Sequence, residues 1–103
     1  MSVPVTPDHI MQLGLGFWAS KTLLSAVELG LFTDLALTPM TAEQIGKRFN
    51  LHTRSLRDFL DALVSLRVLE RDSEGLYRNT PEAEMFLDRS KPSYVGGMLE
   101  MAN

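Results

Sequence analysis

The chain has 103 residues, of which 45% are hydrophobic, and it carries a formal net charge of -3. It has no cysteine, which excludes a disulfide framework and a cysteine-ligated metal site and suits a reducing compartment such as the cytoplasm. A chain of this length corresponds to one small domain, so we assign residues 1–103 to a single domain. The first residues lack the basic start and the following apolar run that mark a signal peptide. Charged residues interrupt the longest hydrophobic stretch, so it is too short to span a membrane.

The first predicted helix runs from about Pro7 into the region of Leu29. Thr6 is a candidate cap, proline is tolerated at the first helical position, and Asp8 suits the positive end of a helix. Gly14 and Gly16 weaken the helix locally, so we expect a point there at which it can kink.

This helix is too apolar to be covered from one side. Within "GLGFWASKTLLSAVELGLF", the only polar stripe consists of Lys21, Ser25 and Glu28. One layer of short helices would leave much of the remaining surface open, so we predict an obligate, intertwined homodimer built on the helix from about Met11 to Phe32. The residues predicted to form the dimer interface are Leu13, Phe17, Trp18, Leu23, Leu24, Val27 and Leu31.

Two shorter helices follow. "TAEQIGKRF" has Thr41 and Gln44 at the spacing of a capping box, and it places Ile45 and Phe49 on one face. "LHTRSLRDFLDALVSLRVL" has helical spacing of its apolar residues behind a predicted cap at Thr53.

The rest of the chain predicts a hairpin and one more capped helix. Two short extended pieces flank the turn cluster from Asp72 to Gly75, where glycine supplies a positive φ. Thr80 and Pro81 then begin another helix, which "RSKP" ends before the closing segment "SYVGGMLEMAN". The predicted fold is mainly α: a winged helix-turn-helix with a small β-hairpin and a long N-terminal helix for dimerisation.

A winged helix raises the alternative of a dimeric DNA-binding transcriptional regulator. The candidate recognition helix carries Arg54, Arg57 and Arg67, but Asp58 and Asp61 lie among them and leave a small positive sum. The hairpin carries more acidic than basic residues. A surface that binds phosphates usually has a basic patch, so this charge pattern disfavours nucleic acid as a partner.

Residues with acid–base or metal chemistry are scattered. His9 and His52 are far apart in sequence and fit cap or turn positions, and they offer no metal-ligand spacing, so no metal site and no catalytic residue is predicted. The pairs Asp58/Asp61 and Glu82/Glu84 fit a solvated helix face or a favourable helix dipole.

Three stretches together resemble a known family. "MQLGLGFWASKTLLSAVELGLF", "TAEQIGKRFNLHTRSLRDFLDALVSLRVLERD" and "YRNTPEAEMFLDRSKPSYVGGMLEMA" are similar, in this order, to the N-terminal winged-helix dimerisation domain of S-adenosylmethionine-dependent O-methyltransferases. This group includes hydroxyindole, plant phenolic and bacterial polyketide enzymes. The resemblance implies helix-swapped dimers, a C-terminal Rossmann-like catalytic domain, and residues of the partner's first helices that close the acceptor-substrate pocket.

The cofactor site implied by the resemblance is not expected in this chain. Gly14 and Gly16 lie in a helical pattern with no strand before them, and Gly96 and Gly97 lie in an apolar run with no acidic residue following. S-adenosylmethionine is therefore expected to bind elsewhere in a longer parent enzyme. The chain stops at Asn103 inside a hydrophobic segment, and we interpret it as a fragment that is not catalytic by itself.

The aromatic pair in the first helix has two interpretations. Trp18 lies three and seven residues before Lys21 and Ser25, so it extends the polar stripe and requires cover. Phe17 and Trp18 either pack in the dimer interface or, as the resemblance allows, reach the partner's pocket and stack on an aromatic substrate. Met11, Met98 and Met101 could line the same cavity or simply fill the core.

Overall fold

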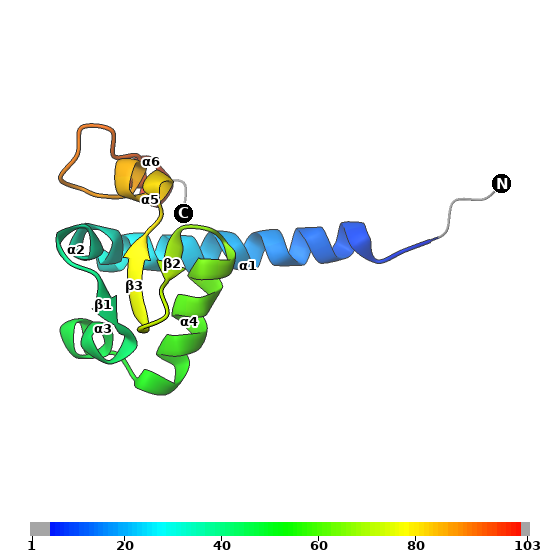
Figure 1. Ribbon diagram of the computed structural model, residues 1–103. Coiled ribbons are helices and arrows are strands. Elements are labelled where there is room, and N and C mark those ends of the chain that lie inside the picture. The colour runs from blue at the N-terminus through cyan, green and yellow to red at the C-terminus, as the bar shows by residue number, and fades with distance from the viewer. Residues whose placement is uncertain (1–4, 102–103) are drawn as a thin grey trace.

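The computed structural model describes residues 5–101, although the side chains of Leu15, Phe17, Thr53 and Glu100 lie outside that description. Nine elements follow one another in this range: α1 (Asp8–Leu29), α2 (Leu31–Leu37), β1 (Met40–Thr41), α3 (Ala42–Phe49), α4 (Thr53–Ser65), β2 (Leu69–Arg71), β3 (Leu76–Asn79), α5 (Pro81–Phe86) and α6 (Gly96–Met101). Helices α3 and α4 with the β2–β3 hairpin form a winged helix, which confirms the predicted fold class. In Figure 1, α1 runs through this body and projects beyond it at its N-terminal end.

Helix α1 is longer than the domain needs. It has 22 residues and is continuous through Gly14 and Gly16, so the expected kink is absent from the described helix (Figure 1). Pro7, not Thr6, is its N-cap residue and makes no side-chain capping bond, so the predicted threonine cap is wrong. The C-terminal end is better closed, because Gly30 adopts the left-handed conformation at a φ of 76° and its N–H donates to carbonyls of the last turn.

Helix α2 and strand β1 were not predicted. Gly30 ends α1 and is also the N-cap of α2, so the chain turns and continues as a helix without a loop. Strand β1 pairs antiparallel with β3, with Met40 opposite Tyr77, and the sheet order is β1-β3-β2. The predicted hairpin therefore becomes a three-stranded sheet.

Local capping follows the sequence closely in the second half of the fold. The Thr41–Gln44 capping box is present, and Thr80 Oγ1 accepts a hydrogen bond from the Ala83 N–H at the start of α5. Gly75 has a φ of 83° in the hairpin turn, as predicted. The cap predicted at Thr53 is wrong, because His52 is the N-cap residue and Thr53 is already helical.

The core lies where α1, α2, α4 and the sheet meet. Its largest fully buried side chains are Phe32, Leu31, Ile45, Leu60, Leu63 and Leu69. Two polar side chains join distant segments around this core. Asn79 Nδ2 donates to Phe32 O at 2.8 Å and to Glu84 Oε2 at 2.9 Å, and Arg89 Nη2 donates to Val27 O at 2.7 Å. Asn79 thus attaches β3 to α2 and α5, and Arg89 attaches the segment after α5 to the end of α1, where a cation also suits the helix dipole.

Candidate dimer interface

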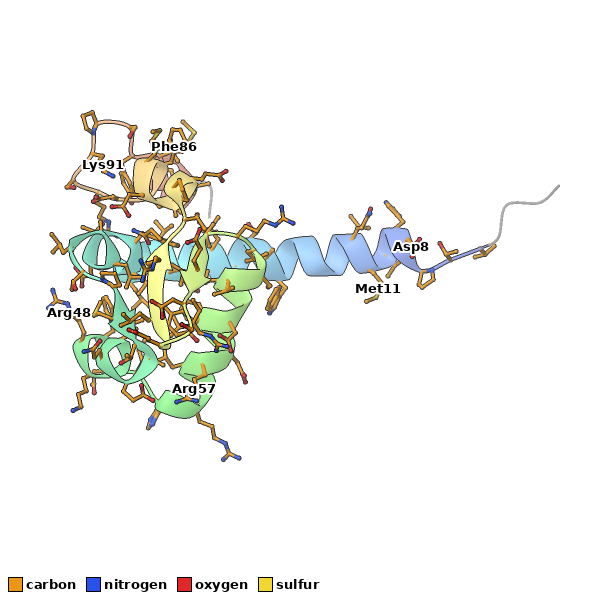
Figure 2. All side chains as sticks on the ribbon, in the orientation of Figure 1. Asp8, Met11, Arg48, Arg57, Phe86 and Lys91 are labelled. Carbon is orange, nitrogen blue, oxygen red and sulfur yellow. The ribbon has the colours of Figure 1, made fainter. Side chains whose placement is uncertain are left out.

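The N-terminal half of α1 presents apolar side chains to solvent. Ile10, Met11, Leu13 and Trp18 are 72%, 54%, 64% and 46% exposed, respectively. Figure 2 shows the Met11 side chain beside Asp8 on the projecting part of α1, away from the winged-helix body. Burial of a large apolar side chain is worth about 1.5–3 kcal/mol. Leaving this group of side chains in water would therefore be costly.

The two halves of α1 behave differently. Val27 and Leu31, both predicted for the interface, are buried in the core of the protomer, where α1 and α2 meet. Leu23 and Leu24 are half-buried, and Leu23 packs against that core. The helix is thus covered by its own domain in its C-terminal half and open in its N-terminal half. The side chain of Phe17, the remaining predicted residue, lies outside the described residues.

Two apolar grooves flank the covered half of α1. One, of about 430 Å³, lies between α1 and the turn joining α3 to α4, and its apolar walls are Leu29, Leu51, Leu56 and Phe59. Ser25, Asn50, His52 and Ser55 complete its lining. The other, of about 310 Å³, is lined by Leu23, Val68, Glu82, Phe86, Leu87, Val95 and Leu99. The surface around α1 therefore offers concave apolar sites as well as a projecting apolar helix.

Three arginines on the face that a DNA-binding winged helix would use are paired with carboxylates. Arg57 Nη2 lies 2.7 Å from Glu43 Oε1, and Arg78 Nη2 lies 2.7 Å from Asp72 Oδ2. Arg71 Nη1 is 3.5 Å from Asp61 Oδ1, and α4 ends before Arg67. Carboxylates on the same surface neutralise these three guanidinium groups, which weakens this surface as a binding site for phosphates.

One carboxylate of each pair that the sequence assigned to a solvated helix face or a helix dipole has a structural partner. Asp61 Oδ1 accepts a hydrogen bond from Tyr77 Oη at 2.7 Å, which links α4 to β3. Burial of the ring, together with the bond to Asp61, raises the pKa of Tyr77 above its ordinary value. Glu84 holds Asn79 and lies near Lys91. Within residues 5–101, no cluster of three histidine, aspartate or glutamate residues could hold a metal ion.

The glycine pairs do not form a cofactor loop. Gly14 and Gly16 lie inside α1, where their backbone N–H groups belong to a continuous helix. A Cβ atom on Gly96 would lie 2.1 Å from Tyr94 Oη, so the tyrosine ring occupies the space beside this glycine. Neither glycine pair therefore forms the loop between a strand and a helix that binds a phosphate.

The hairpin turn depends on the charge of Asp72. Its Oδ1 accepts hydrogen bonds from the backbone N–H groups of Glu74 and Leu76, and Oδ2 faces Arg78. The bond from Leu76 contributes most, and these contacts hold the pKa of Asp72 below its ordinary value. Because the pKa is lower in the folded state than in the unfolded state, this stabilisation is present above the unfolded-state pKa and is lost as the pH falls through the folded-state pKa.

We therefore expect Asp72→Asn to lower the midpoint of urea unfolding at neutral pH. The difference from wild type should shrink in acid, as the pH falls through the lowered pKa of the Asp72 carboxyl, because the protonated carboxyl is uncharged like the amide. Chemical unfolding followed by circular dichroism at neutral pH and along an acid pH series measures this. Asp58→Asn, which removes an exposed carboxylate on α4, is the matched control. An unchanged midpoint at neutral pH for Asp72→Asn would contradict the assignment.

None of the helices in the described part of the chain is both long enough and apolar enough to span a membrane. A winged helix with paired surface charges and an open apolar helix indicates a domain for protein association.

Comparison with known proteins gives the family. The sequence model of the O-methyltransferase dimerisation domain matches residues 11–89, and the chain belongs to this family, as the sequence resemblance implied. None of the comparisons supports the DNA-binding alternative.

Similar proteins include two curated Streptomyces methyltransferases. The tetracenomycin polyketide synthesis 8-O-methyl transferase TcmO of Streptomyces glaucescens is 50% identical over 97 residues, which are 94% of this chain and 29% of that protein. The N,N-dimethyltransferase OxyT of Streptomyces rimosus is 44% identical over 88 residues, 85% of this chain and 25% of that protein. The chain thus spans less than a third of the length of these relatives.

A solved structure has the same fold. Human N-acetylserotonin methyltransferase, in complex with S-adenosylmethionine, superposes with a TM-score of 0.84 at 26% identity over 97% of this chain and 31% of that chain.

Proposed function

We propose that this domain joins two copies of a parent methyltransferase through the N-terminal half of α1. The observation that carries the proposal is the exposure of Ile10, Met11, Leu13 and Trp18 on a helix that projects from its own domain. The chain belongs to the family of O-methyltransferase dimerisation domains, so a second copy of the chain is the expected partner of these side chains. Val27 and Leu31 stabilise the protomer and are not part of the proposed contact surface.

The parent is proposed to transfer a methyl group from S-adenosylmethionine to a hydroxyl oxygen of a small aromatic acceptor. TcmO is named as an 8-O-methyl transferase of polyketide synthesis, and the human structure is an N-acetylserotonin methyltransferase. The cofactor and the chemistry are assigned to the remainder of the parent, since the described residues do not fit a cofactor loop. The absence of cysteine is consistent with a cytoplasmic parent.

A second candidate for the acceptor atom is nitrogen. OxyT, which is 44% identical, is named as an N,N-dimethyltransferase. The names of similar proteins therefore include both oxygen and nitrogen as the acceptor atom. Product analysis of the parent with phenolic and amine acceptors separates the two.

The same half of α1 is proposed to contribute to substrate binding in the partner. Trp18 and Met11 lie exposed on the N-terminal half of α1, and Phe17 precedes Trp18 in the chain. An aromatic ring and a thioether are suited to covering a flat acceptor. The exposed apolar side chains of α5, of α6 and of the residue before α6 are proposed to face the catalytic domain; they are Met85, Phe86, Val95, Met98 and Met101.

Light scattering coupled to size-exclusion chromatography tests the association. We expect the chain to elute with twice its monomer mass of 11.5 kDa at low micromolar concentration, and a well-behaved monomer would contradict the proposal.

In the parent enzyme, we expect Trp18→Ala to raise KM for the acceptor more than KM for S-adenosylmethionine. Loss of the dimer with equal effects on both constants would instead assign Trp18 to the interface alone.

A further inference from the structure

A loop follows the short helix α5 and returns to its end. Residues 88–95 lie between α5 and α6, and in Figure 1 this orange loop extends past α5 on the side of α2. The last four carbonyls of an α-helix have no partner within the helix itself. In α5 each of them accepts a hydrogen bond, and the four pairs are Ala83 O with Leu87 N, Glu84 O with Lys91 Nζ, Met85 O with Ser93 Oγ, and Phe86 O with Val95 N. The loop is thus attached along its length, and we call residues 88–95 the strap.

One residue of the strap reaches the corner at which α1 meets α2. Arg89 Nη2 donates to Val27 O at 2.7 Å and to Glu28 O at 3.4 Å, in the last turn of α1. The backbone N–H of Arg89 donates to Thr33 Oγ1 of α2 at 3.0 Å. A Cβ atom on Gly30 would lie 3.3 Å from Arg89 Nη1, so the glycine at this corner leaves room for the guanidinium group. Arg89 therefore attaches the strap to both helices that meet at Gly30.

The other end of the strap contacts α6. Arg89 Nε donates to Tyr94 Oη at 3.4 Å, and the Tyr94 ring lies where a Cβ atom on Gly96, the first residue of α6, would be. Helix α6 has six residues, and a helix of this length has little stability of its own. It packs against α1, and Leu99 contacts the core. A continuous path of contacts therefore runs from the end of α1 through Arg89 and Tyr94 to the start of α6.

From these contacts we infer that the strap couples α6 to the C-terminal end of α1, and that Arg89 is the residue that holds the two in one relative position. Without Arg89 the strap still caps α5, but α6 separates from α1 and exposes Leu99. In the parent, the strap then fixes the orientation of the catalytic domain that follows α6 relative to the dimer. This consequence rests on the proposed function, whereas the coupling rests on the contacts of this chain alone.

Thiol labelling tests the coupling, because the chain has no native cysteine. Leu99 is half-buried, so the thiol of Leu99→Cys reacts slowly with an aromatic disulfide reagent while α6 is in place and fast when α6 opens. We expect Arg89→Ala to speed this reaction about tenfold or more, since it removes hydrogen bonds made by a charged group. Leu51→Cys, half-buried in the turn between α3 and α4, reports on the rest of the fold and should keep its rate.

Arg48→Ala is the matched control for the loss of the guanidinium. Arg48 Nε lies 2.8 Å from Asp34 Oδ2, so this substitution also removes an arginine that joins two helices, α3 and α2. It does not touch the strap, and we expect the labelling rate of Leu99→Cys to be unchanged.

Alanine at each glycine of α6 gives an independent test. Alanine favours a helix more than glycine does, so both substitutions should slow the labelling of Leu99→Cys if α6 depended only on its own helical stability. A Cβ atom on Gly97 would have no neighbouring atom within 4 Å, whereas one on Gly96 would collide with Tyr94. We expect Gly97→Ala to slow labelling and Gly96→Ala to speed it, because the displaced tyrosine no longer meets Arg89.

Two outcomes overturn the inference. A labelling rate of Leu99→Cys that Arg89→Ala leaves unchanged means that apolar contacts with α1 hold α6 by themselves. An equal rise in the rate of Leu51→Cys means that Arg89 stabilises the whole domain and not the coupling. Light scattering of the same samples tests the proposed function separately: a monomeric wild-type chain removes the proposed dimer and leaves the coupling within the chain to be read from the thiol rates.

Kinetics of the parent test the consequence for the enzyme. We expect Arg89→Ala to raise KM for the acceptor, because the proposed acceptor site lies between the catalytic domain and the partner's α1, while the dimer mass and KM for S-adenosylmethionine stay at wild-type values. An unchanged KM for the acceptor would contradict a role of the strap beyond this domain.

Discussion

Met11→Glu is expected to convert the dimer into a monomer while leaving the winged-helix body folded. Met11 is 54% exposed on the projecting half of α1, so a glutamate there is solvated in the monomer and loses its water in the dimer. A cost of about 4 kcal/mol corresponds to about a thousandfold weaker association. Light scattering or sedimentation across a concentration series measures the shift.

Met85→Glu is the matched control, because Met85 is also 54% exposed but lies on α5. It changes the same residue type to the same charge, and we expect its dimer to dissociate at the wild-type concentration. Equal weakening by both substitutions would mean a general effect of charge and would remove the support for α1 as the contact surface.

Phe32→Ala is expected to cause the largest loss of stability. Phe32 is 1% exposed and is the largest of the fully buried side chains, and its backbone carbonyl also accepts a bond from Asn79. Removal of a buried phenylalanine costs about 3–5 kcal/mol, a large part of the 5–15 kcal/mol that stabilises a typical domain. Urea unfolding at one fixed protein concentration measures the loss, since association also contributes to apparent stability.

Leu37→Ala serves as the control within the same helix. Leu37 is exposed at the end of α2, so its truncation should change the unfolding free energy by no more than about 0.5 kcal/mol. A Phe32→Ala variant as stable as Leu37→Ala would mean that α2 does not pack into the core as described.

Elements encoded by short-range signals could be predicted from the sequence. The capping box at Thr41, the turn glycine at Gly75 and the Thr80 cap each depend on residues within four positions of one another, and the structure contains all three. Helix α2 was missed because Gly30 both ends α1 and begins α2. The apolar pattern of the sequence therefore has no loop that would separate the two helices. Strand β1 has two residues, too few for an alternating pattern, and depends on pairing with distant β3.

The extent of the candidate interface could be predicted only in part. Apolar residues on all sides of α1 indicated that something must cover it, but composition does not tell which half the same chain covers. The structure separates Val27 and Leu31, which lie in the core, from Met11, Leu13 and Trp18, which do not. The tie from Arg89 to the end of α1 spans 62 positions, and no local pattern could reveal it.

The open half of α1 contains Gly14 and Gly16, each of which costs a helix about 0.5–1 kcal/mol relative to alanine. A short isolated helical segment is marginal in water, and this one is exposed in the protomer. The ordering of the backbone in this segment is then coupled to the association of the subunits. Part of the binding free energy offsets lost chain entropy, and dilution of the protein should reduce its helical content along with its mass.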